Sequence, residues 1–371
     1  MRIAIQAADL DHKRIDGTRV YLLNVLKWLG KISPADEFLI YHRRDFNPEL
    51  CPPNFPNYRF KKADFPFFWT QTRFARELCK DKPDVLWMPM HNIPILRRKG
   101  LKTVVTIHDL AFKYFSDHFP KKELLKLNFL ADLAIKKSDK IIAVSQSTKR
   151  DILKFYPGIK EEKVRVIYHG FDSELFQKEI SEDKIKKVLK SYHLQAKSYI
   201  LYVGAIQPRK NLETLIETFN FIKKEKPELK LVLAGEKAWL WEGIIEKIEK
   251  SPYQKDIILT GGISFEELAV LYQNAALFVF PSLYEGFGIP VLEAFAAGVP
   301  VVCSRNSSLP EVSGDAALYF SGSDMKELAD TITRTLKDEG LKSSLISKGL
   351  EQLKKFSWEK CARETLEYLK S

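Results

Sequence analysis

The feature that most constrains the fold is a regular alternation of short apolar runs with longer segments of helical periodicity. The short runs are apolar at successive positions, as in strands covered on both faces. They are predicted as strands at residues 2–7, 37–41, 85–88, 103–107, 140–144, 164–167, 199–203, 230–234, 257–260, 277–280 and 299–303. Strands that alternate with helices in this way predict an α/β fold built from doubly wound parallel sheets.

The pattern restarts once, after the charged segment 176–196, which has no strand character. A chain of 371 residues exceeds one ordinary core and suits two domains. We therefore predict two Rossmann-like domains, at 1–175 and 197–355, with a hinge region between them and their sheets facing a cleft. Ligands of open α/β sheets bind beyond the carboxyl ends of the strands, so the loops after the strands are where chemistry is expected.

Composition excludes several classes of protein. Hydrophobic residues make up 45% and charged residues 29% of the chain, unlike disordered, collagen-like or membrane-spanning proteins. The net charge of +11 fits a solvated basic surface or an anionic partner, namely a nucleotide, a membrane or a nucleic acid. The basic residues are dispersed among acidic ones and no nucleic-acid-binding module is present, so we expect no nucleic-acid partner.

Cysteine usage and the amino terminus predict a location. Cys51, Cys79, Cys303 and Cys361 are scattered and form no C-x-x-C pair, which indicates a reduced protein without a zinc or redox motif. The first residues have the pattern of a strand rather than that of a signal peptide. We therefore expect the protein in the cytoplasm.

Two loops of the first domain carry candidate residues. Gly17 follows the first strand and opens a helix, where backbone N–H groups can meet an anion. His108 and Asp109 end the strand 103–107, a position suited to hydrogen bonding or proton transfer. A simple turn at Gly17 and a structural His–Asp pair explain these loops equally well.

The loop 204–211 of the second domain joins Gly204, Arg209 and Lys210 to the start of a helix, with Asn211 predicted as its N-cap. Two cations beside a glycine turn at a helix N-terminus can clamp a diphosphate. Solvated surface charge is the alternative. The spacing is not that of a Walker loop, so NTP hydrolysis is not indicated.

The most informative loop is 281–294. It contains Glu285 and Glu293, separated by seven residues, with Gly286 and Gly288 between them. The glycines allow backbone N–H groups to approach a ligand, and the two carboxylates can meet a sugar and a ribose diol. Packing explains two carboxylates around a glycine loop poorly, which favours a binding site.

Taken together, these motifs resemble the family 4 glycosyltransferases of the GT-B fold. Residues 285–293 match the E-x7-E motif of that family, with G-F-G-x-P inside it, and residues 209–211 match its diphosphate-binding R-K-N element. His108-Asp109, Val144-Ser145 and residues 166–172 match further landmarks in the same order. The resemblance covers essentially the whole chain.

The resemblance implies a retaining transferase that moves a sugar from a nucleotide-sugar, held mainly by the second domain, to an acceptor. Arg209 and Lys210 would bind the diphosphate and neutralise the charge of the leaving group. Glu293 would bind the ribose and Glu285 the donor sugar. It also implies a final helix, 356–371, that crosses back to the first domain.

Further roles follow from the same resemblance. Glycines and apolar residues would line the donor through their backbone, with the sugar and phosphates near Gly286, Phe287 and Gly288, and the base near Gly262 and Ile263. Gly204 belongs to the same donor site.

In the first domain, Gly17 would admit the diphosphate and His108 would lie near the reacting sugar. The residues expected to act in catalysis are thus His108, Arg209, Lys210 and Glu285. Acceptor contacts are expected from Asp109 and Trp69.

No cofactor is expected, because the nucleotide-sugar is a substrate. Asp9-Leu10-Asp11 matches a metal-binding D-x-D motif by its letters, but the Arg–Lys pair already supplies positive charge for the leaving diphosphate. We therefore predict no catalytic metal. The resemblance further implies front-face substitution, in which the leaving diphosphate helps to deprotonate the acceptor.

The landmarks at 106–110 and the aromatic stretch 65–74 are most like those of the mannosyltransferase branch, so GDP-mannose is the favoured donor and a glycan or lipid-linked glycan the acceptor. A UDP-sugar donor, a non-catalytic protein that binds nucleotide-sugars or glycans, and an epimerase or phosphorylase of the same fold are the alternatives. The stretch 65–74 fits core packing, an acceptor shelf or peripheral contact with an anionic membrane at the inner face of the cell membrane.

Overall fold

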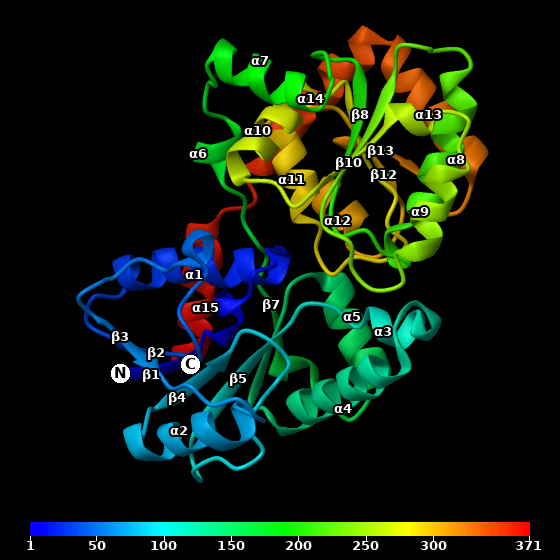
Figure 1. Cartoon of the computed structure of the whole chain (residues 1–371). Coiled ribbons are helices and arrows are strands. Elements are labelled where there is room, and N and C mark those ends of the chain that lie inside the picture. The colour runs from blue at the N-terminus through cyan, green and yellow to red at the C-terminus, as the bar shows by residue number, and fades with distance from the viewer. The chain divides into compact units, whose positions relative to one another are not determined.

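A computed structural model describes all 371 residues, which divide into two compact units (Figure 1). The first unit consists of residues 1–114, 121–170 and 357–371. The second consists of residues 115–120 and 171–356. Each unit has its own parallel sheet, so the expected α/β class with two doubly wound, Rossmann-like sheets is confirmed.

The first unit is built on a seven-stranded sheet of order β3-β2-β1-β4-β5-β6-β7, in which every pairing is parallel. Its strands are β1 (Arg2–Gln6), β2 (Glu37–His42), β3 (Tyr58–Lys62), β4 (Val85–Met88), β5 (Lys102–Ile107), β6 (Lys140–Ala143) and β7 (Val164–Val166). The sequence analysis missed β3, because this edge strand is largely exposed and alternates polar with apolar residues.

The helices of the first unit are α1 (Gly17–Ile32), α2 (Ala75–Asp81), α3 (Ala111–Tyr114), α4 (Lys121–Lys137), α5 (Gln146–Phe155) and α15 (Trp358–Lys370). The last of these, at the carboxyl terminus, packs against α1 and β4 and therefore belongs to this unit. Ser357 caps α15 by accepting a hydrogen bond from the Lys360 N–H, and Gly170 lies so close to the backbone of Trp358 that no side chain fits there.

The second unit has a six-stranded sheet of order β10-β9-β8-β11-β12-β13, again with every pairing parallel. Its strands are β8 (Tyr199–Val203), β9 (Lys230–Ala234), β10 (Ile257–Gly261), β11 (Leu277–Phe280), β12 (Val301–Ser304) and β13 (Ala317–Phe320). Strand β13, a four-residue edge strand, was also missed from sequence.

The helices of the second unit are α6 (Ser173–Phe176), α7 (Glu182–Ser191), α8 (Leu212–Lys223), α9 (Glu242–Glu249), α10 (Phe265–Asn274), α11 (Ile289–Ala296), α12 (Leu309–Ser313), α13 (Met325–Lys337) and α14 (Glu339–Leu353). A capping box formed by Ser264 and Glu267 starts α10. The segment 176–196, expected as a hinge region, lies within this unit, where α7 packs against α10.

Each sheet has a topological switch point, where successive strands of the chain are added first on one side of a central strand and then on its other side. In the second sheet β8 lies between β9 and β11, so the loops that follow β8 and β11 leave neighbouring strands at the same edge. In the first sheet β1 and β4 have the same relationship. Ligand sites of such sheets form at these points. None of the helices is both long and apolar enough to cross a membrane.

Candidate functional site

The switch point of the second sheet brings together the two loops that the sequence singled out. The loop after β8 ends in a short 3-10 helix, Pro208–Lys210, and the loop after β11 runs from Pro281 to Gly288. Their backbones are joined directly, because the Leu283 N–H donates to the Arg209 carbonyl at 3.0 Å. Residues about 75 positions apart in sequence therefore form one surface.

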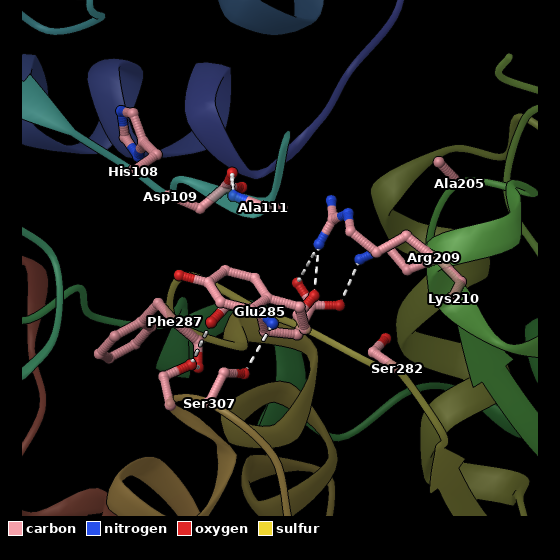
Figure 2. Close-up of polar contacts among 12 residues, drawn as sticks. His108, Asp109, Ala111, Ala205, Arg209, Lys210, Ser282, Glu285, Phe287 and Ser307 are labelled. Carbon is pink, nitrogen blue, oxygen red and sulfur yellow. Dashed lines mark hydrogen bonds and ion pairs between the residues drawn. The ribbon is translucent and has the colours of Figure 1, made fainter. Parts of the chain in front are cut away.

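Glu285 is held by both cations of the first loop (Figure 2). The Lys210 ammonium contacts Glu285 Oε1, and Arg209 Nη1 lies 3.7 Å from Oε2. Arg209 also donates to the Tyr284 carbonyl. Glu285 and Lys210 are each only 8% exposed. Two cations gathered in one partly buried site favour the binding of an anion there.

Two serines hold the backbone of this loop. The Glu285 N–H donates to Ser307 Oγ at 2.8 Å (Figure 2). The Ser308 hydroxyl lies 2.9 Å from the Glu285 carbonyl oxygen and 2.7 Å from that of Phe287. The sequence analysis missed both serines. Their only signal was position, since they follow β12, the next strand along the same edge of the sheet. Gly288 then starts α11 with a φ of +109°, which favours glycine.

Glu293 lies on α11, one turn beyond its start, and is supported by a tyrosine of α10. The Tyr272 hydroxyl donates to Glu293 Oε2 at 2.9 Å. Burial raises the pKa of Glu293 to about 7, the Tyr272 hydrogen bond lowers it, and the nearby charge of Asp172 raises it. This carboxylate therefore titrates near neutral pH, unlike an exposed one. Tyr272 is a third residue that the sequence analysis missed.

The glycines that end neighbouring strands allow close backbone approach. Gly204 has a φ of +149°, and a Cβ on Gly235 would lie 2.0 Å from the Gly204 carbonyl oxygen. Gly235 in turn bridges to Gly261, which precedes Gly262 and Ile263. Any side chain at position 262 would meet the Glu236 carboxylate, at 2.8 Å. The loops after β8, β9 and β10 thus lie against one another at the same edge of the sheet as Arg209 and Lys210.

In the first unit, His108 follows β5 and is buried. Its Nε2 lies 2.8 Å from the Pro89 carbonyl oxygen, and its ring packs edge-on against Tyr21. Because a carbonyl oxygen only accepts, Nε2 carries the proton and Nδ1 is left as an acceptor. Burial lowers the pKa of His108, so the ring is neutral at pH 7. The next residue, Asp109, accepts a hydrogen bond of 3.0 Å from the Ala111 N–H.

The loop after β1 starts α1 at Gly17. Asp16 caps this helix by accepting from the Arg19 N–H, and Arg19 Nε donates to the Asp9 carbonyl at 3.0 Å. Asp11, the second carboxylate of the D-x-D pattern, pairs with Arg43 at 3.4 Å. No three His, Cys, Asp or Glu side chains of the chain are arranged to hold a metal ion.

The aromatic stretch 65–74 of the first unit contains both buried and exposed side chains. Trp69, expected at the acceptor, is 6% exposed, stacks on Phe74 at 5.0 Å and donates its indole N–H to the Ala63 carbonyl. It is a core residue, because its large ring completes the apolar packing around Phe74. Phe67 and Phe68 are exposed instead, at 70% and 81%.

The predicted site residues thus fall into two groups. The donor residues Gly204, Arg209, Lys210, Gly262, Ile263, Glu285, Gly286, Phe287, Gly288 and Glu293 belong to the second unit. Gly17, Trp69, His108 and Asp109 belong to the first.

Comparison with known proteins places this geometry in a family. The model "Glycosyl transferases group 1" matches residues 181–352, and "Glycosyltransferase Family 4" matches residues 16–175. O-antigen chain mannosyltransferase B of Escherichia coli is 30% identical over 266 residues, which are 71% of this chain and 69% of that protein. The chain belongs to the family 4 glycosyltransferases. The resemblance drawn from the motifs is confirmed, and this protein is a glycosyltransferase.

Other relatives of this glycosyltransferase are also named as mannosyltransferases. O-antigen chain mannosyltransferase RfbU of Salmonella typhimurium is 30% identical over 246 residues, covering 65% of this chain and 62% of that protein. The serotype-specific mannosyltransferase WbdA of Escherichia coli is 31% identical over 288 residues, but the match covers only 34% of WbdA. The chain spans about a third of that relative.

Solved structures share the whole fold of this glycosyltransferase. Anabaena Alr3699/HepE in complex with UDP-glucose superposes with a TM-score of 0.78 at 16% identity, over 100% of this chain and 99% of that one. WaaG, a glycosyltransferase involved in lipopolysaccharide biosynthesis, gives 0.76 at 15% identity, over 100% and 99%. These likenesses show the GT-B fold.

Proposed function

We propose that this glycosyltransferase transfers a hexose, with mannose from GDP-mannose as the favoured donor, to a glycan or a lipid-linked glycan. Relatives at about 30% identity are named as mannosyltransferases of O-antigen chains, which supports the sugar and the class of acceptor. A UDP-sugar donor is the alternative, because the solved structure of the same fold from Anabaena holds UDP-glucose.

The observation that carries the proposal is the pair of salt bridges that Arg209 and Lys210 form with Glu285. Cleavage of a sugar–phosphate bond leaves negative charge on the diphosphate, and preorganised cations in a partly dry site stabilise it. An incoming diphosphate would take the two cations in place of the Glu285 carboxylate. Glu285 would then be available to accept hydrogen bonds from the hydroxyls of the donor sugar.

We further propose that the transfer retains the anomeric configuration and uses no metal or other cofactor. The bond from the anomeric carbon to the phosphate oxygen breaks, and the acceptor oxygen bonds to the same face of that carbon. The acceptor proton passes to the leaving phosphate oxygen. Arg209 and Lys210 supply the charge that a divalent ion supplies in other transferases. His108, neutral and with Nδ1 unprotonated, would accept a hydrogen bond from the sugar.

Peripheral contact with an anionic membrane is part of the same proposal. Phe67 and Phe68 share an exposed edge of the first unit with Ile95 and Leu96, and Gln71 ties the two loops by hydrogen bonds to Ile93 and Ile95. Exposed apolar side chains near basic residues suit an anionic leaflet. Flotation with phosphatidylglycerol vesicles should recover the wild type but not a Phe67→Ser/Phe68→Ser variant, and wild-type protein left at the bottom would refute membrane contact.

The test of the function is nucleotide release from a panel of GDP-, UDP-, ADP- and dTDP-sugars, with Glu285→Ala as the control and thermal shifts in parallel. We expect GDP-mannose to be hydrolysed slowly and to stabilise the wild type selectively. A preference for a UDP-sugar would show that the donor is a UDP-sugar rather than GDP-mannose. The absence of any response to all four classes of donor would favour a non-catalytic binding protein. With a glycan acceptor, NMR of the product determines the anomeric configuration, and loss of transfer in EDTA would contradict metal independence.

A further inference from the structure

Asn211 is the third residue of the R-K-N element, but the resemblance gives a donor contact only to Arg209 and Lys210. Its sequence position predicts the N-cap of α8, but the side chain makes no capping bond to that helix. The backbone instead adopts the left-handed conformation, with φ 56° and ψ 37°, which residues other than glycine seldom adopt and which asparagine tolerates best. Asn211 is therefore the N-cap of α8 by position, as predicted, but its side chain does not make the capping bond.

The side chain of Asn211 bonds to two other loops. Nδ2 donates to the Pro281 carbonyl at 3.2 Å and to the Gly322 carbonyl. A primary amide has two N–H bonds, so it can satisfy both acceptors at once. Because carbonyl oxygens only accept, the NH2 end of the amide faces them, and Oδ1 accepts from the Thr214 hydroxyl at 2.8 Å.

The two bonds that Nδ2 donates join segments that follow different strands. Pro281 comes directly after β11, and Gly322 lies in the turn after β13. Asn211 itself ends the loop after β8. One side chain thus connects three of the loops at the carboxyl edge of the sheet. Arg209 adds a backbone link, since its carbonyl accepts from the Leu283 N–H.

We propose that Asn211 is a positioning residue that holds the loop of Lys210 against the loop of Glu285, so that the backbones of both loops are in place before the donor binds. The inference rests on the proposed function of the donor site. Lys210 is next to Asn211 in the chain and Glu285 lies on the loop that begins at Pro281, so the paired side chains belong to the two segments that Asn211 joins. Release of the amide would let the two loops move independently, and a misplacement of about 1 Å can cost a hundredfold in rate.

Asn211→Asp tests this role with almost no change of shape. It replaces the donating amide by a carboxylate that faces two carbonyl oxygens, so both bonds are lost and repulsion is added. Asn211→Gly removes the side chain and keeps the left-handed backbone. Asn57→Asp is the matched control, because Asn57 Nδ2 also donates to two carbonyls, of Gly30 at 3.3 Å and Ser33 at 2.9 Å, in the first unit.

The first measurement is hydrogen exchange of residues 281–288 without any donor. We expect faster exchange of the Leu283 and Glu285 N–H groups in both Asn211 variants and no change there in Asn57→Asp. Unchanged exchange in Asn211→Gly would overturn the positioning role. This outcome does not depend on activity, so it is distinct from a failure of the proposed function, which would appear as a wild type that neither binds nor cleaves any donor.

The second measurement is donor kinetics with the preferred nucleotide-sugar. We expect Asn211→Asp and Asn211→Gly to lower kcat/KM at least about tenfold, with most of the loss in kcat, because preorganisation is lost rather than a donor contact. Asn57→Asp should keep kcat/KM within about twofold at a similar loss of Tm. Variants of Asn211 with wild-type kcat/KM would refute a positioning role. If Asn211→Asp fails to fold, Asn211→Gly decides alone.

Discussion

Tyr272 and Glu293 form a buried pair in which the phenolic O–H donates to Glu293 Oε2 at 2.9 Å. The tyrosine comes from α10 and the glutamate from α11, so the pair couples two helices of the second unit. The same hydroxyl lies 3.2 Å from the Pro290 carbonyl, at the start of α11. This arrangement fixes the orientation of the carboxylate and also changes the pH at which the carboxyl group ionises.

Stability should depend on the charge of Glu293. Burial raises the pKa of this carboxyl to about 7 in the folded chain, above its ordinary value of 4.5. The folded chain therefore keeps this proton to higher pH than the unfolded chain does. The stability that Glu293 contributes is present below pH 4.5 and is lost as the pH rises through about 7, by about 3 kcal/mol in full.

Glu293→Gln keeps the shape and cannot ionise. We expect it to unfold like the wild type at pH 4.5 and to be more stable than the wild type at pH 8. Urea unfolding of both proteins across this range measures the difference. Parallel curves for the two proteins would show that Glu293 does not titrate in this window.

Tyr272→Phe should change the pH dependence of donor binding. In the wild type the hydrogen bond from Tyr272 stabilises the charged form of the Glu293 carboxylate. Loss of this bond therefore raises the pKa of Glu293 further. If Glu293 must be ionised to accept from the ribose, donor KM at pH 7 should rise by a factor of about 3 to 10, and less at pH 8.5. Tyr199→Phe is the control, because its hydroxyl donates only to the Leu271 carbonyl, at 2.6 Å. An unshifted KM profile in Tyr272→Phe would contradict the assignment.

Glu285→Gln should separate binding from transfer. Arg209 and Lys210 lose a competing anion, so GDP or UDP should bind at least as tightly as in the wild type. Transfer should fall by a factor of about 10² to 10³, because the charged contact to the donor sugar is lost. Calorimetry and product formation measure the two effects. Glu266→Gln, which breaks an exposed pair with Lys184 in the same unit, should leave both unchanged.

Lys210→Met should destabilise the protein by up to about 3 kcal/mol, because it removes one of the two cations from a buried carboxylate. In Lys210→Met/Glu285→Gln the buried charge is gone as well, and we expect most of the lost Tm to return without any return of activity. Additive losses in the double variant would mean that the two side chains do not act as a pair.

Much of the fold could be read from local pattern. The strands of the two sheets could be predicted because most are apolar at successive positions, as in strands buried on both faces. Strands β3 and β13 were missed because edge strands bury less apolar surface and have a weaker apolar pattern. The loop 281–294 stood out as a candidate site because glycines and carboxylates at this spacing have few structural explanations.

The sequence by itself determined the class of fold and the family and predicted the residues of a donor site, since hydrophobic periodicity and motif spacing are properties of neighbouring residues. Only the tertiary structure decided which groups meet. Asn211 bonds to carbonyls that are 70 and 111 positions away, and Ser307 and Ser308 hold a loop that precedes them by a whole helix and strand. It also buried Trp69, exposed Phe67 and Phe68, and brought Tyr272 to Glu293. Such partners depend on strand order, because parallel strands gather distant loops at one edge of a sheet.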